Sequence, residues 1–147
     1  MQEPIAMNHE KHPTLLLSRV DVERIEALLD SPAYRGMNTA ALREELERAE
    51  LAEPDALPPD LITMNTTALV QVVDGDKSEH QYELTLVYPR DSDGSGEKVS
   101  ILAPVGSALL GLRVGDSIDW PMPGGRSARL RVLAVRYQPE AAGELHR

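Results

Sequence analysis

The chain has 147 residues, a formal net charge of −9 at pH 7, 41% hydrophobic residues and no cysteine. Its length suits one compact core with an appendage, its acidity argues against a general electrostatic grip on nucleic acid, and the missing thiols exclude disulfides and thiolate zinc sites. Because no run of about 18 apolar residues is present and the N-terminus lacks a signal-peptide pattern, we expect a cytoplasmic protein without a membrane span.

The first half of the chain is predicted to form a helical hairpin. Residues 1–17 are expected to be partly disordered, and Ser18 then offers an N-cap for a helix over residues 19–30. Pro32 interrupts the apolar spacing of three and four, and a second helix is predicted from residue 38 or 39 to about residue 52. We expect the two helices to fold back on each other over residues 18–53, with the stretch around Pro32 as the tip.

The second half is predicted to be a sheet domain. Prolines make residues 54–62 a stiff linker, and beyond it the apolar spacing changes from three and four to two, which favours strands. The predicted strands cover residues 63–73, 82–88 and 99–102, a segment after Gly115, and residues 128–137, with a short helix near residues 107–110. This pattern predicts an α+β protein whose domain over residues 63–147 is a five-stranded, mostly antiparallel sheet with one short helix.

The candidate motifs for metal binding, cofactor binding and catalysis in this sequence lack residues that such motifs require. Asp91 and Asp93 open a loop like that of an EF-hand, but the twelfth position is Leu102 and the loop joins two predicted strands. Ser107 lacks the second glycine of a nucleophile elbow. Asp30 is a single acid at the hairpin tip and has no second carboxylate beside it. From these three observations together, we predict no catalytic residue, no metal site and no cofactor.

Several segments together resemble a known family. The stretch "APVGSALLGLRVGDSI" has the order and spacing of the final domain of the Gre transcript-cleavage factors of bacterial RNA polymerase. The segments "PAYRG", "TMNT", "TLVYP" and "YQPEAAG" narrow the resemblance to a Gre-related family, the regulators of nucleoside diphosphate kinase. The similarity covers about residues 14–145.

The resemblance implies an N-terminal antiparallel coiled-coil hairpin followed by an FKBP-like domain that docks at the secondary channel of RNA polymerase. In Gre factors, acids at the hairpin tip help to position magnesium for RNA cleavage. Here the first helix spans only about 18 Å and the tip offers Asp30 without an adjacent acid. We therefore expect a non-catalytic regulator that binds RNA polymerase and competes with Gre factors, and that has no direct contact with nucleic acid, membrane or a small-molecule substrate.

The residues expected to contact the polymerase are Asp30, Tyr34 and Arg35 in the tip and Pro104 in the docking loop. Tyr34 has an alternative role, which is to pack across the two helix ends and stabilise the turn. Two other functions stay open. The protein could regulate nucleoside diphosphate kinase levels outside the polymerase through protein binding, or it could retain cleavage activity that depends on Asp30.

Overall fold

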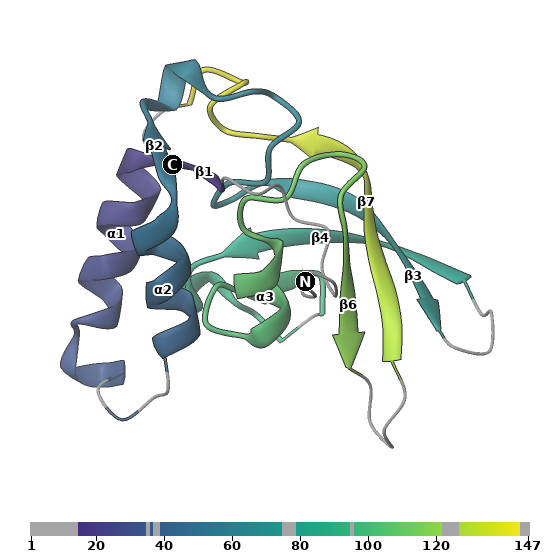
Figure 1. The fold of residues 1–147 in the computed structure, drawn as a ribbon, viewed down its shortest axis with the longest axis horizontal. Coiled ribbons are helices and arrows are strands. Elements are labelled where there is room, and N and C mark those ends of the chain that lie inside the picture. The colour runs from purple at the N-terminus through teal and green to yellow at the C-terminus, as the bar shows by residue number, and fades with distance from the viewer. Residues whose placement is uncertain are drawn as a thin grey trace, which may run out of the picture.

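The computed structural model describes residues 15–34, 36, 39–74, 79–94, 96–121 and 127–144. Its centre is a curled five-stranded sheet with a pair of helices beside it (Figure 1). The strands are β3 (Thr67–Asp74), β4 (Glu79–Val87), β5 (Lys98–Ser100), β6 (Ser117–Pro121) and β7 (Ser127–Tyr137), in the spatial order β5-β4-β3-β7-β6. Only β4 and β5 run parallel, so the predicted five-stranded, mostly antiparallel sheet is confirmed.

The apolar residues of the long strands explain where the core lies. On the central strand β3, Ala68 and Val70 are buried, and Val70 is paired with the buried Val132 of β7. Residues two apart on a strand share one face, so these side chains cover one side of the sheet. Helix α3 (Pro104–Leu109) packs beside β5 and β4 and also contributes the buried Leu109 to the core.

The hairpin consists of α1 (Arg19–Leu29), a 3₁₀ turn (Pro32–Tyr34) and α2 (Ala40–Arg48), which lie side by side at one end of the sheet (Figure 1). The buried residues of the hairpin and of the sheet belong to one continuous hydrophobic cluster; those of the two helices are Val22, Ile25, Leu29, Leu42 and Leu46. Helices of this length are marginal alone, so the hairpin depends on its packing against the sheet.

The predicted end of the second helix is wrong. Helix α2 stops at Arg48 because Ala49 is extended, and the chain then forms β2 (Glu50–Ala52). This strand pairs in parallel with β1 (Leu16–Ser18), and the Glu50 amide donates a 2.7 Å hydrogen bond to the Leu15 carbonyl. A strand of three residues is too short to show a hydrophobic periodicity of its own, and it forms here because of a partner that is distant in the sequence. The prediction therefore extended the helix to residue 52.

Other predictions about the N-terminal region are not tested. The expected disorder concerns mainly residues 1–14, which lie outside the described residues, whereas Leu15 and Leu17 are buried. The coiled-coil geometry of the hairpin and the FKBP-like arrangement of the sheet remain predictions. Within the described residues, every helix is too short or too polar to cross a membrane.

The N-cap of α1 leads to a prediction about stability. The Ser18 hydroxyl accepts a 3.3 Å hydrogen bond from the Asp21 amide, and the side chain is buried. We expect Ser18→Ala to lower the free energy of unfolding by about 1 kcal/mol in urea titrations, since an orphan helix amide loses its acceptor. Thr39, the N-cap of α2, makes no side-chain cap bond, although its hydroxyl accepts a 3.3 Å hydrogen bond from Arg43 Nε, and it serves as the control. An equal loss in Thr39→Ala would contradict this explanation.

Candidate functional site

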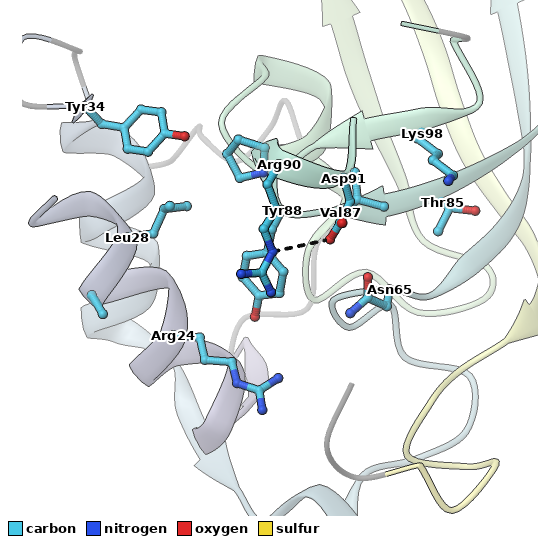
Figure 2. A pocket seen from close by; sticks show the side chains of 12 residues that line it. Arg24, Leu28, Tyr34, Asn65, Thr85, Val87, Tyr88, Arg90, Asp91 and Lys98 are labelled. Atoms are coloured by element: carbon cyan, nitrogen blue, oxygen red, sulfur yellow. Dashed lines mark ion pairs between the residues drawn. The ribbon is translucent and has the colours of Figure 1, made fainter. Parts of the chain in front are cut away.

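A groove of about 960 Å³ lies between the hairpin and the end of β4 (Figure 2). The apolar and aromatic residues that line it are Ala27, Leu28, Tyr34, Val87, Tyr88 and Pro89. The polar residues that line it are Arg24, Asn65, Thr85, Arg90, Asp91 and Lys98. The groove therefore brings together segments that are far apart in the sequence, from both the helical and the sheet part.

Two tight turns shape the sheet side of this groove. Pro89 begins a 3₁₀ turn (Pro89–Asp91) directly after Tyr88, and proline at the first helical position ends β4. In the other turn, the Thr66 amide donates to the Thr63 carbonyl at 3.1 Å, and Asn65 has a φ of 67°. Asparagine tolerates this left-handed conformation, which a type II turn requires at its third position. Both turns thus hold polar side chains at the groove wall.

The groove is locally cationic in an acidic protein. Three of its lining residues, Arg24, Arg90 and Lys98, carry positive charge, against the single acid Asp91. Arg90 Nε lies 3.9 Å from Asp91 Oδ2, and the two side chains are 85% and 49% exposed. Lys98 Nζ likewise lies 3.9 Å from Asp93 Oδ2, so two of the three cations each have an acid beside them.

Tyr88 places an unsatisfied polar group at this site. The side chain is 8% exposed, and its hydroxyl has no hydrogen-bond partner within the part of the chain that the structure describes. Burial raises the pKa of Tyr88 and the Asp21 carboxylate adds to this, whereas Arg24 lowers it. In Figure 2 the ring extends toward α1, with its hydroxyl on the side of Arg24. Arg24 therefore lies close to this buried hydroxyl, at the edge of the groove.

Asp21 lies deeper, where the hairpin joins the sheet. Its carboxylate accepts a 3.0 Å hydrogen bond from the Met64 amide, and the residue is 2% exposed. Burial raises the pKa of Asp21 to about 7, against the Met64 hydrogen bond, with a further rise from Glu140. Glu140 in turn accepts a 2.7 Å hydrogen bond from the Thr63 hydroxyl. This joint connects α1, the turn before β3 and the segment after β7.

The predicted tip residues have different environments. Asp30 is the C-cap of α1, and its exposed carboxylate lies 3.2 Å from the Arg43 guanidinium, so it connects the two helices. Tyr34 is half-buried and lines the groove. Arg35 lies outside the described residues. The tip therefore contributes an aromatic side chain to the groove and an ion pair to the hairpin.

Pro104, the predicted docking residue, is the first residue of α3. Its helix borders a smaller cavity of about 180 Å³ against α2, which is lined by Ala41, Leu42, Glu45, Ser107 and Ala108. The beginning of α3 approaches β5 closely, because a Cβ on Gly106 would lie 1.9 Å from the Ser100 carbonyl oxygen. Pro104 thus starts a helix that is held against both the sheet and the hairpin.

Sequence reasoning missed the groove. Asn65 and Tyr88 stand in the segments "TMNT" and "TLVYP", which carried the family resemblance, whereas Arg24 stands in the first helix, outside those segments. The succession of tyrosine, proline and arginine after a strand was the available signal. Among the residues that the structure describes, no group of three His, Asp or Glu side chains could hold a metal ion.

Two family models match this chain. The model described as the Rnk N-terminus matches residues 13–51, and the model described as the C-terminal part of the transcription elongation factors GreA and GreB matches residues 57–137. The boundary between them falls in the proline-rich segment that separates the hairpin from the sheet.

Individual relatives agree with these matches. The regulator of nucleoside diphosphate kinase of Escherichia coli strain K12 is 47% identical over 134 residues, which cover 90% of this chain and 96% of the relative. The transcription elongation factor GreA of Rhodospirillum rubrum is 35% identical over 96 residues, which cover 65% of this chain and 59% of that protein. The similarity to GreA thus covers only part of this chain and only part of GreA.

One solved structure has a similar fold at high sequence identity. It is described as a prokaryotic transcription elongation factor GreA/GreB from Nitrosomonas europaea, and it is 48% identical to this chain with a TM-score of 0.71. The match covers 86% of this chain and 100% of that one.

Proposed function

This chain belongs to the family of the regulators of nucleoside diphosphate kinase, in which an Rnk N-terminus precedes a GreA/GreB C-terminal domain, and on that basis we propose that it regulates transcription by binding RNA polymerase. The proposed binding site on the polymerase is the region of the secondary channel. There the protein competes with Gre factors and does not stimulate RNA cleavage. The support for the partner is the GreA/GreB-type domain, which makes up the larger part of the chain.

The chemistry of the hairpin tip is the observation that carries the non-catalytic part of this proposal. Asp30 is the single acid of the tip sequence from residue 30 to residue 39, and its carboxylate is paired with Arg43. Magnesium beside a phosphate is usually held by one or two carboxylates, and here the one carboxylate of the tip is already paired with a cation. Helix α1 has 11 residues and extends only about 17 Å. A short hairpin with a paired acid can occupy space without activating water.

The contact surface that we propose has two parts. Tip residues Asp30, Tyr34 and Arg35 face the channel, and the segment that begins at Pro104 docks at its rim. The first part belongs to the hairpin and the second to α3. The two elements are adjacent in the fold, since residues of both α2 and α3 line the small cavity. One partner surface can therefore contact both.

A competition assay tests this function. We expect that excess protein, added to backtracked polymerase complexes with magnesium, leaves intrinsic RNA cleavage unchanged and suppresses the cleavage stimulated by a Gre factor. The physical reason is that both proteins need the same channel entrance. Failure to bind core polymerase at micromolar concentration would contradict the proposal. Shortened RNA that appears with this protein alone and disappears with Asp30→Asn would instead show a cleavage enzyme.

A second function is favoured by the name of the relatives. Proteins 47% identical to this chain are named regulators of nucleoside diphosphate kinase, and such regulation could act through protein binding outside the polymerase. Affinity capture that recovers the kinase and no polymerase subunit would favour this alternative over the first.

A further inference from the structure

We propose that the contact of Asp21 with the turn before β3 is a proton-dependent hinge, at which the hairpin separates from the sheet more often as the pH rises toward neutrality. The hinge consists of Asp21 on α1, Thr63 and Met64 in that turn, and Glu140 after β7, and these four residues are called the Asp21 joint. Such a hinge is independent of any partner, because it concerns how the two parts of the chain are held together.

The Asp21 joint lies where the two parts of the fold meet. Asp21 is in the first turn of α1, and its carboxylate accepts a 3.0 Å hydrogen bond from the Met64 amide. The Thr63 hydroxyl in the same turn donates a 2.7 Å hydrogen bond to Glu140. One turn is thus held by two carboxylates, one from the hairpin and one from the segment after β7. Separation of Asp21 from the turn frees the start of α1 without breaking a strand pairing of the five-stranded sheet.

The charged and titratable groups around Asp21 act in both directions. The Met64 amide, Arg24 and the N-terminus of α1 favour the charged carboxylate, whereas Glu140 disfavours it. The Tyr88 hydroxyl at the end of β4 is close enough to interact with Asp21 and stays neutral, since burial raises its pKa further. Burial of Asp21, which is 2% exposed, is the largest effect and raises its pKa to about 7. The ionised carboxylate is therefore destabilised while the joint is closed.

Opening of the joint lets water reach this carboxylate. In water Asp21 has its ordinary pKa of 3.8, so the closed state binds the proton more tightly than the open state does. Loss of the proton as the pH rises then favours the open state. Proton linkage between these two pKa values gives an opening equilibrium constant that rises about fiftyfold from pH 5 to pH 7 and levels off above that.

The hairpin is the part that can open by itself. Helices α1 and α2 have 11 and 9 residues, which makes them marginal without their packing against the sheet. The strands beside them, β1 and β2, pair over three residues, whereas β3 pairs along its whole length with both β4 and β7. Local opening begins in the elements with the fewest mutual contacts. We therefore expect the hairpin to open before the sheet does.

Native-state hydrogen exchange of the full chain tests this proposal, at increasing urea concentrations and at pH 5, 6 and 7. We expect the amides of Ile25 and Leu29 in α1 to be less protected than the Val132 amide of β7, which donates to the Asp116 carbonyl at 3.0 Å. Their protection should also depend less on urea, because the hairpin exposes less surface than the whole protein. After correction for intrinsic exchange, it should fall about fiftyfold from pH 5 to pH 7. Equal protection and equal urea dependence of α1 and β7 would overturn the proposal.

Three variants assign the pH dependence to the joint. Asp21→Asn keeps an acceptor for the Met64 amide but cannot ionise, so the fall in protection with pH should disappear. Glu140→Gln should reduce the fall, since it removes the neighbouring charge and keeps an acceptor for Thr63. Glu26→Gln, at an exposed position of α1, is the matched control and should keep the full pH dependence.

The pH series has two further outcomes that contradict a proton-dependent hinge. One is a fall in protection that persists in Asp21→Asn, because another group would then control the opening. The other is protection of Ile25 and Leu29 that stays constant from pH 5 to pH 7 in the unchanged protein. This last measurement needs no substitution, so it decides the question even where a variant fails to fold.

Discussion

Replacing Asp21 by asparagine is expected to stabilise the protein at pH 8 by about 3 kcal/mol and to leave its stability at pH 4 almost unchanged. Burial raises the pKa of Asp21 from its ordinary value of 3.8 to about 7. The folded protein therefore binds this proton more tightly than the unfolded chain does. A difference of this size corresponds to about 4 kcal/mol of unfolding free energy.

The sign of the effect follows from proton binding. Between pH 4 and pH 7 the folded state keeps the Asp21 proton and the unfolded state loses it, so the contribution of this group to stability falls as the pH rises through that window. Asparagine stays neutral, and its amide oxygen can still accept the hydrogen bond from the Met64 amide. The variant should lose the pH dependence and keep the connection between α1 and the sheet.

Urea titrations of both proteins at intervals from pH 4 to pH 8 measure this difference. Glu26→Gln is the control, because Glu26 is an exposed residue of the same helix. We expect the Asp21→Asn curve to rise relative to the unchanged protein as the pH increases, and the Glu26→Gln curve to stay parallel to it. A constant difference over the whole range would contradict a raised pKa of Asp21.

Gly106→Ala is expected to destabilise the protein by about 3 kcal/mol or more. A Cβ at this position would lie 1.9 Å from the Ser100 carbonyl oxygen and 2.8 Å from its carbonyl carbon. Both are backbone atoms of β5 and its end, so no side chain can rotate away and helix α3 must move from the sheet. Overpacking of a buried contact usually costs about 1–3 kcal/mol, and a backbone clash lies at the upper end.

Gly36→Ala is the matched control, since a Cβ on Gly36 would meet no atom within 4 Å. Its free energy of unfolding should be unchanged or slightly higher, because alanine restricts the unfolded chain. Equal stability of the Gly106→Ala and Gly36→Ala variants in urea would show that α3 is not held closely against β5.

Local signals in the sequence predicted those elements that make their own pattern. The spacing around Val22 and Ile25 predicted α1, and the Ser18 cap is found at its N-terminus. The alternation in β4 and the long apolar run of β7 predicted strands of the sheet. These elements bury a repeated set of side chains on one face, and such periodicity is visible in a single stretch of chain.

Contacts between distant segments were not predictable in the same way. Strands β1 and β2 exist because Leu16 and Glu50 become neighbours, and the groove exists because α1, the Asn65 turn and Tyr88 come together. Asp30 is an example inside the predicted site, since its pairing with Arg43 depends on how the two helices meet. Each of these features depends on a distance across the fold.

By itself the sequence determined the class of this protein, which is a helical hairpin followed by a GreA/GreB-type sheet, as well as the absence of an acid pair at its tip. Hydrophobic periodicity and motif spacing depend only on residues that are close together in the chain, so they can be recognised without knowledge of the fold. Only the tertiary structure decided the raised pKa of Asp21 and the cationic groove with its unsatisfied Tyr88 hydroxyl. Burial and electrostatic potential depend on which segments pack together, and that packing is created by folding.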